Sequence, residues 1–142
     1  MQHIWGIPIA AACIRGETDI RGEVRFYEKC GGVFVAAEIR GLPEDGFHGF
    51  HIHVGKSCGG AEFSDSMGHY NPDNTAHPDH AGDLPPLLSC GGCAFMTVLT
   101  KRFSIHDILG RTVIIHSRRD DFITQPAGDS GTKIACGEIK KC

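Results

Sequence analysis

The sequence has little of what a helical, membrane-spanning or nucleic-acid-binding protein needs. It lacks a long apolar run that could cross a bilayer, and it lacks the sustained 3.6-residue apolar period of amphipathic helices. Positive charge is also scarce, since 14 Lys and Arg against 17 Asp and Glu give a formal net charge of -3. We therefore expect a globular protein with no nucleic-acid partner and no membrane partner.

A secretory signal is also missing from the start of the sequence. Met1-Gln2-His3-Ile4-Trp5 has no basic segment, and the apolar residues that follow contain Pro8 and lead directly into the first expected strand. As the sequence stands, we expect a cytoplasmic protein. A secreted or periplasmic protein is the alternative if residues 1–142 are a processed form.

Glycine, proline and short alternating segments are what the sequence does contain. There are 19 Gly and 7 Pro in 142 residues, a length typical of one domain. Short, mostly alternating apolar segments bounded by Gly-rich turns predict a sandwich or flattened barrel, which makes residues 1–142 a single all-β domain. The expected strands are 7–15, 22–29, 33–40, 46–53, 94–103, 111–117 and 133–139.

Two segments interrupt this pattern. Residues 54–88 form a stretch of 35 residues rich in Gly, Pro, Asp, Ser and His, without periodicity. A loop of this length in a compact domain is usually functional. A second, shorter loop is expected at 120–131.

Three of the nine histidines lie in Gly46-Phe47-His48-Gly49-Phe50-His51-Ile52-His53. On an extended strand His51 and His53 share one face, about 7 Å apart along the backbone, whereas His48 points to the opposite, apolar face. The pair suits a metal ion, and His48 is better interpreted as structural. Packed or solvated histidine pairs also occur, so the metal interpretation depends on further ligands.

Further ligands follow in the long loop. His69, His77, His80 and Asp83 lie within fifteen residues of one another, and three imidazoles with one carboxylate suit tetrahedral zinc. His116 lies in a later expected strand, on the face opposite to the apolar residues of that strand. The sequence therefore predicts two metal sites.

These motifs resemble those of the copper-zinc superoxide dismutases. They occur in the order of that family, span nearly the whole chain, and are highly specific in combination. The matching segments are His48-Gly49-Phe50-His51-Ile52-His53, Gly68-His69-Tyr70-Asn71-Pro72, Gly82-Asp83-Leu84, Gly110-Arg111-Thr112 with His116, Asp120-Asp121, and Ala135-Cys136-Gly137.

The resemblance implies an eight-stranded Greek-key β-barrel with a long metal-binding loop and a shorter second active-site loop. It also implies copper and zinc as cofactors. The implied copper ligands are His51, His53, His69 and His116. The implied zinc ligands are His69, His77, His80 and Asp83.

Further roles follow from the resemblance. Asp120 matches the carboxylate that orients one copper histidine and one zinc histidine, and Cys58 and Cys136 match the disulfide of the family. His69 would bridge the two metals and deliver a proton during catalysis. Lys133 stands where the family usually has an arginine that guides the substrate.

The sequence also departs from the family. Lys133 keeps the positive charge but loses the fixed fork of guanidinium donors, so we expect reduced rather than abolished activity. The alternative is that Lys133 is a solvated cation at a strand edge. His77 and His80 are closer together than usual, and the loops after Cys58 and over residues 121–133 are short, which bears on zinc geometry and substrate steering.

Five of the seven cysteines have no family counterpart. Cys90-Gly91-Gly92-Cys93 is interpreted as a pair flanking a glycine turn between two strands. A thioredoxin-like dithiol would need a βαβ setting. A zinc thiolate site would need two more cysteines, which Cys13, Cys30 and Cys142 could supply.

The predicted function is therefore that of a superoxide dismutase, which converts superoxide to oxygen and hydrogen peroxide as copper alternates between Cu(II) and Cu(I) beside a structural zinc. A non-enzymatic protein on the same fold that stores or delivers copper is the alternative, and a module holding zinc alone is a third. A second copy of the chain and a copper-donor protein are compatible partners.

Overall fold

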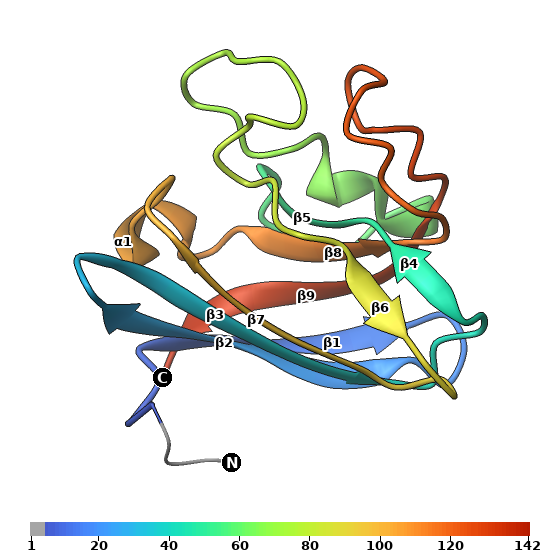
Figure 1. Cartoon of the computed structure of the whole chain (residues 1–142), viewed down its shortest axis with the longest axis horizontal. Coiled ribbons are helices and arrows are strands. Elements are labelled where there is room, and N and C mark those ends of the chain that lie inside the picture. Colours follow the sequence, from blue (N-terminus) through green and yellow to red (C-terminus); the bar gives the residue numbers. More distant parts are fainter. Residues whose placement is uncertain (1–4) are drawn as a thin grey trace.

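Residues 5–142, which the computed structural model describes, are almost entirely antiparallel β-structure (Figure 1). A 3-10 segment, η1 (Ala61–Ser66), and a short helix, α1 (Ile105–Ile108), are the two helical elements among them. Residues 1–4 lie outside the described residues. They make up most of the N-terminal segment on which the expectation about secretion rests. The strands are β1 (Ala10–Gly16), β2 (Arg21–Lys29), β3 (Gly32–Arg40), β4 (Gly46–His48), β5 (Phe50–His53), β6 (Leu87–Ser89), β7 (Ala94–Thr100), β8 (Thr112–His116) and β9 (Lys133–Lys141).

Seven strands form one curled sheet in the order β5-β8-β9-β1-β2-β3-β7, and β4 pairs with β6. The two-stranded ribbon joins the two edges of this sheet, because β4 leads into β5 at one edge and β6 leads into β7 at the other (Figure 1). Joining the edges in this way leaves few strand edges unpaired. The predicted all-β barrel-like fold is confirmed.

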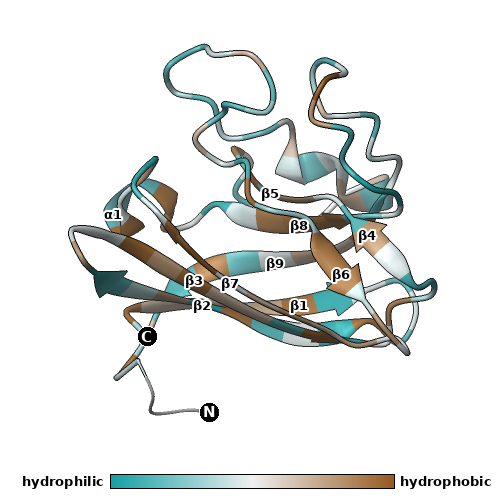
Figure 2. Ribbon diagram, in the orientation of Figure 1, coloured by the Kyte–Doolittle hydropathy of each residue, from teal (hydrophilic) through white to brown (hydrophobic). Residues whose placement is uncertain are grey.

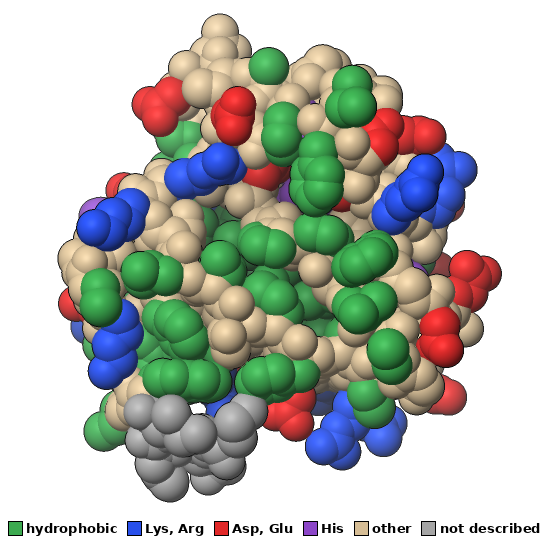
Figure 3. Space-filling model, viewed as in Figure 1, with side chains coloured by type: hydrophobic (Ala, Val, Ile, Leu, Met, Phe, Trp, Pro, Cys, Tyr) green, Lys and Arg blue, Asp and Glu red, His purple; other side chains and the backbone are tan. Residues whose placement is uncertain are grey.

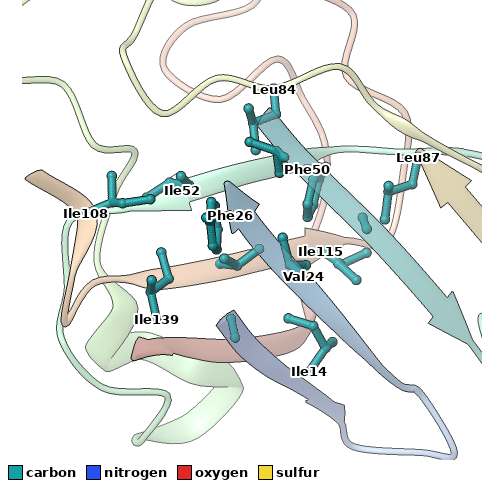
Figure 4. Packing of buried hydrophobic residues seen from close by; sticks show 14 of the residues in the cluster. Ile14, Val24, Phe26, Phe50, Ile52, Leu84, Leu87, Ile108, Ile115 and Ile139 are labelled. Carbon is teal, nitrogen blue, oxygen red and sulfur yellow. The ribbon is translucent and has the colours of Figure 1, made fainter. Parts of the chain in front are cut away.

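The core of the barrel follows from the two-residue period of its strands. Phe26, Phe50, Ile52, Ile115 and Ile139 are fully buried and point into the shared interior (Figure 4). Apolar residues concentrate on the strands, whereas the loops above the barrel are mostly hydrophilic (Figure 2). Burial of each large apolar side chain stabilises the fold by roughly 1.5–3 kcal/mol.

Some element boundaries differ from the sequence-based predictions. The strand expected over 94–103 ends at Thr100, and α1 follows, capped by Ser104 and Asp107, each of whose side chains accepts the other's backbone N–H. The expected histidine strand is divided at Gly49 into β4, which pairs with β6, and β5, which pairs with β8. Such divisions depend on which strand lies alongside, and the sequence pattern carries no information about that.

The two long loops lie together on one side of the barrel (Figure 1). One contains η1 and connects β5 to β6, and the other connects β8 to β9. The barrel therefore presents both loops to a shared site.

Within residues 5–142, no helix has the length and apolar character needed to cross a membrane.

Candidate metal centre

Three histidines of the candidate site come from the paired strands β5 and β8. The register joins Phe50 to Ile115, so the alternate residues His51, His53 and His116 all face away from the core. These three histidines are at most 3% exposed. His116 Nε2 lies 3.4 Å from His53 Nε2, which places these ring nitrogens within reach of one ion.

The long loop adds His69 to this group. His69 forms an isolated antiparallel bridge with His53, and one nitrogen from each of the four histidines lies within 4.8 Å of the others. The Nδ1 atom of His51 and the Nε2 atom of His69 are buried without a hydrogen-bond partner. Buried polar atoms are rarely left without partners, so the donor set fits a metal ion.

His69 also faces a second cluster through its other nitrogen. Its Nδ1 lies 2.8 Å from Asp83 Oδ1 and 3.1 Å from His80 Nδ1. The Nδ1 atoms of His77 and His80 lie 3.1 and 3.3 Å from Asp83 Oδ2. Three imidazoles and a carboxylate, the ligand types that zinc takes, thus lie close together around Asp83. His51 also comes within 4.8 Å of His69, His77 and Asp83.

Asp120 connects the two clusters. His51 Nε2 lies 2.7 Å from Asp120 Oδ2, and His77 Nε2 lies 2.7 Å from Asp120 Oδ1. If both Nε2 atoms donate to this carboxylate, the Nδ1 atoms are left unprotonated and available to metals. Burial raises the pKa of Asp120, but hydrogen bonds from His51, His77 and the Phe122 amide outweigh it and hold that pKa below its usual range.

Burial also keeps the strand histidines neutral. It lowers the pKa of His51 to about 4 and that of His116 to about 3, and it holds the pKa of His53 well below the usual range. A neutral imidazole has a lone pair that a metal can accept. At neutral pH these side chains are therefore ligands ready for a cation.

The separated histidine, His48, takes no part in either cluster. Its Nδ1 lies 2.9 Å from the His116 carbonyl oxygen, and its Nε2 lies 3.0 Å from the Glu44 carbonyl oxygen. The buried ring thereby links the start of the histidine strand to the end of β8. This agrees with its interpretation as a structural residue.

Cys58 and Cys136 form a disulfide, as the resemblance implied. The bond fastens the segment just before η1 to β9. Cys58 N also donates a long hydrogen bond of 3.4 Å to Glu138 Oε2 on the same strand. The disulfide therefore holds one wall of the site against the barrel.

Comparison with known proteins agrees with this geometry. Residues 20–139 match the sequence model of copper/zinc superoxide dismutase (SODC). The chain is 37% identical over 127 residues to a Cu-Zn superoxide dismutase of Legionella pneumophila, covering 84% of this chain and 77% of that protein. It is 34% identical over 152 residues to Cu-Zn superoxide dismutase A of Xenopus laevis, covering 94% of this chain and 99% of that protein.

The chain belongs to the copper/zinc superoxide dismutase family. As a member, the protein is a superoxide dismutase, and copper and zinc are its cofactors. The two clusters of histidine and carboxylate groups are the places in this superoxide dismutase where metals can be held.

Lys133 lies at the mouth of the superoxide dismutase site. A cavity of about 430 Å³ is lined by Lys133 together with His53, His69 and His116. The ammonium of Lys133 donates to Ser66 Oγ at 2.7 Å and to the Met67 carbonyl oxygen at 2.8 Å. Burial lowers the pKa of Lys133. Lys133 is thus half-buried and bound to the long loop, in contrast to a simply solvated cation.

Three residues of the site were not found from the sequence. Ser66 holds Lys133, and the Gln125 amide accepts from His77 N and donates to the His77 carbonyl, both at 2.8 Å. Gly128, at φ +69°, leaves no space for a Cβ atom, which would lie 2.0 Å from Asp120 Oδ1. These contacts join distant segments and leave no local pattern, except that a glycine often marks a close approach.

Proposed function

We propose that the protein disproportionates superoxide at a copper ion held by His51, His53, His69 and His116. His69, His77, His80 and Asp83 would hold a zinc ion, which would supply positive charge without redox chemistry. The unpartnered, buried nitrogens of His51 and His69 carry this proposal, because nothing else in the described chain satisfies them. We assign His80, and not His51, as the remaining zinc ligand because His51 already belongs to the copper group.

Copper held by these four histidines would supply the redox chemistry, in which one superoxide is oxidised to oxygen and a second, with two protons, is reduced to hydrogen peroxide. The residues of the chain orient the imidazole rings, exclude water from the site and move protons. Asp120 fixes the rings of His51 and His77 through its two oxygens. His69 Nε2, on a side chain only 4% exposed, is the atom at which a proton is held and passed on.

Lys133 contributes mainly charge to this reaction. An ammonium has three donors, and those of Lys133 point to Ser66 Oγ, the Met67 carbonyl and, at 3.5 Å, the Phe63 carbonyl. Few donors remain to bind the anionic substrate directly. A positive charge at the cavity mouth still attracts superoxide and raises the encounter rate.

Metal analysis combined with a superoxide decay assay tests the proposal. Protein loaded with Cu(II) and Zn(II) should contain one copper and one zinc per metal centre and should accelerate superoxide decay. The His116→Ala variant should keep zinc, lose copper and lose activity. If loaded wild-type protein decayed superoxide no faster than this variant, the proposal would be wrong.

A further inference from the structure

A hydrogen-bonded turn outside the metal centre has a cysteine on each side, Cys90 and Cys93. Gly91 and Gly92, at φ +60° and +80°, form the turn between β6 and β7. Cys90 N donates to the Cys93 carbonyl at 2.9 Å, and Cys93 N donates to the Cys90 carbonyl at 3.1 Å. The sequence-based interpretation of cysteines flanking a glycine turn is therefore confirmed, and the two residues lie opposite each other across the turn.

Both thiols are free and exposed on the outer face of the ribbon. Leu88 and Phe95, each two residues from one of the cysteines, are 49% and 51% exposed on the same face. Figure 3 shows hydrophobic side chains gathered on this side of the molecule, over β6 and β7. The thiol pair therefore sits beside an apolar surface, where a soft, weakly hydrated ion is favoured over a hard one.

Backbone pairing of this kind suits a bridging ion better than a disulfide. Two residues that exchange both backbone hydrogen bonds across antiparallel strands have Cα atoms about 5.5 Å apart and Cβ atoms toward the wide end of about 4.5–5.5 Å. A disulfide needs Cβ atoms about 3.5–4.5 Å apart. Two sulfurs on opposite sides of one ion are separated by roughly 4.6 Å, twice a typical metal–sulfur distance.

The surroundings of the turn favour a cation that needs only two ligands. Gly91 N donates to Asp45 Oδ1 at 2.9 Å, and Leu42 N donates to the Gly92 carbonyl at 3.0 Å, so the turn is fixed and has a carboxylate beside it. The other free thiols lie on β1, at the β2–β3 turn and after β9. Zinc usually requires four ligands, whereas thiolates with low coordination select Cu(I).

We propose that Cys90 and Cys93 form a surface dithiolate site for monovalent copper, separate from the metal centre. Binding converts two thiols and one Cu(I) into a two-coordinate complex and releases two protons, with no change of oxidation state. The site lies on the part of the barrel away from the two long loops (Figure 1). The chain would thus hold one copper more than its metal centre accounts for.

Titration of the copper- and zinc-loaded full chain with Cu(I) tests this proposal. The titration is done without oxygen, with ascorbate as reductant and bicinchoninate as a competing Cu(I) chelator. Wild-type protein should bind one more Cu(I) per chain than the Cys90→Ser/Cys93→Ser variant, with an ultraviolet sulfur-to-copper absorption that the variant lacks. The Cys13→Ser/Cys30→Ser variant, which also loses two exposed thiols, should bind as much Cu(I) as wild type.

Three results would overturn the site. One is equal Cu(I) binding by wild type and the Cys90→Ser/Cys93→Ser variant. Another is full displacement of the additional Cu(I) by an equal concentration of Zn(II). The third is recovery of a Cys90–Cys93 disulfide peptide from protein purified without oxygen. Superoxide decay by the doubly substituted protein should remain at the wild-type rate, so failure here is distinguishable from failure of the proposed reaction.

Discussion

Gly128 is a residue at which the second active-site loop approaches the metal centre closely. A Cβ atom there would lie 2.0 Å from Asp120 Oδ1 and 2.7 Å from His77 Nε2, the two atoms that hydrogen-bond to each other. The loop backbone thus covers the carboxylate that orients a histidine of each cluster. Substitution at a residue that binds no metal should therefore change metal affinity.

We expect Gly128→Ala to weaken zinc binding about 10–100-fold, the effect typical of losing a contact that orients a metal ligand. Gly31→Ala is the matched control, since Gly31 has a similar φ of +72° but no atom within 4 Å of the added Cβ. Both variants should lose about 1–2 kcal/mol of stability from left-handed backbone strain. Competition with a zinc chelator measures the affinity, and equal zinc retention by the two variants would contradict the prediction.

Lys133 is a second residue of the site that can be tested, because its side chain lines the same cavity as His53, His69 and His116. Lys133→Arg should raise the superoxide decay rate a few-fold and make that rate more sensitive to salt, because a guanidinium can contact the loop carbonyls and keep donors free for the anion. Lys133→Gln, which removes the charge, should lower the rate at low salt. Stopped-flow decay at several salt concentrations is the measurement. Rates unchanged in both variants would remove Lys133 from the site.

At the scale of elements, the disulfide and Lys133 support the same loop. Cys136 and Lys133 both lie on β9, and both reach the segment around η1, one through a covalent bond and the other through hydrogen bonds to Ser66 and Met67. Met67 also receives a hydrogen bond of 2.7 Å from His53 Nδ1. One loop thus positions both His53, a residue of the four-histidine cluster, and the ammonium of Lys133.

Removal of this disulfide should affect both stability and rate. Cys58→Ser/Cys136→Ser opens a covalent loop with a sequence separation of 78 residues. The free energy of unfolding should fall by about 4 kcal/mol in the chain-entropy description. Urea unfolding of metal-free protein measures this change, with Cys13→Ser/Cys30→Ser as the control. A metal-loaded double variant should also show slower superoxide decay, since the loop holding Lys133 is released.

At the scale of the whole molecule, the barrel shields a cluster of imidazoles from solvent. The curled sheet and the two loops together bury His51, His53 and His116, although each imidazole would ionise more readily in water. The fold therefore favours neutral histidines. Neutral histidines can bind a metal, but keeping them neutral lowers the stability of the metal-free chain in acid. The match to the family covers residues 20–139, and a single domain over residues 1–142 stays a prediction.

Metal-free protein should lose stability as the pH falls from about 6.5 toward 4. Burial lowers the pKa of His51 to about 4 and that of His116 to about 3, so the unfolded chain binds these protons more readily than the folded chain. Stability is therefore full above about pH 6.5, the ordinary histidine pKa, and declines below it. Urea unfolding across this range measures the decline. A His51→Gln variant should show a shallower decline.

The sequence alone determined those features that depend on neighbouring residues. The two-residue period assigned β2, β3 and β8 to strands, and the same period separated His51 and His53 from the core-facing residues. Motif order led to the family and to the Cys58–Cys136 disulfide. Local geometry is sufficient for the strands and for the facing of His51 and His53, because side chains alternate across any extended strand. The disulfide pairing came from the resemblance to the family.

Only the tertiary structure decided how distant segments meet. Lys133 donates to Ser66, and the Gln125 amide hydrogen-bonds to the His77 backbone. Gly128 approaches Asp120. Each of these contacts joins residues that no short pattern connects. The pairing of the Cys90 and Cys93 backbones likewise depends on how the chain turns between β6 and β7. The physical reason is that strand pairing and loop closure are set by packing and hydrogen bonds across the whole barrel, whereas a sequence pattern reports only on the nearest residues.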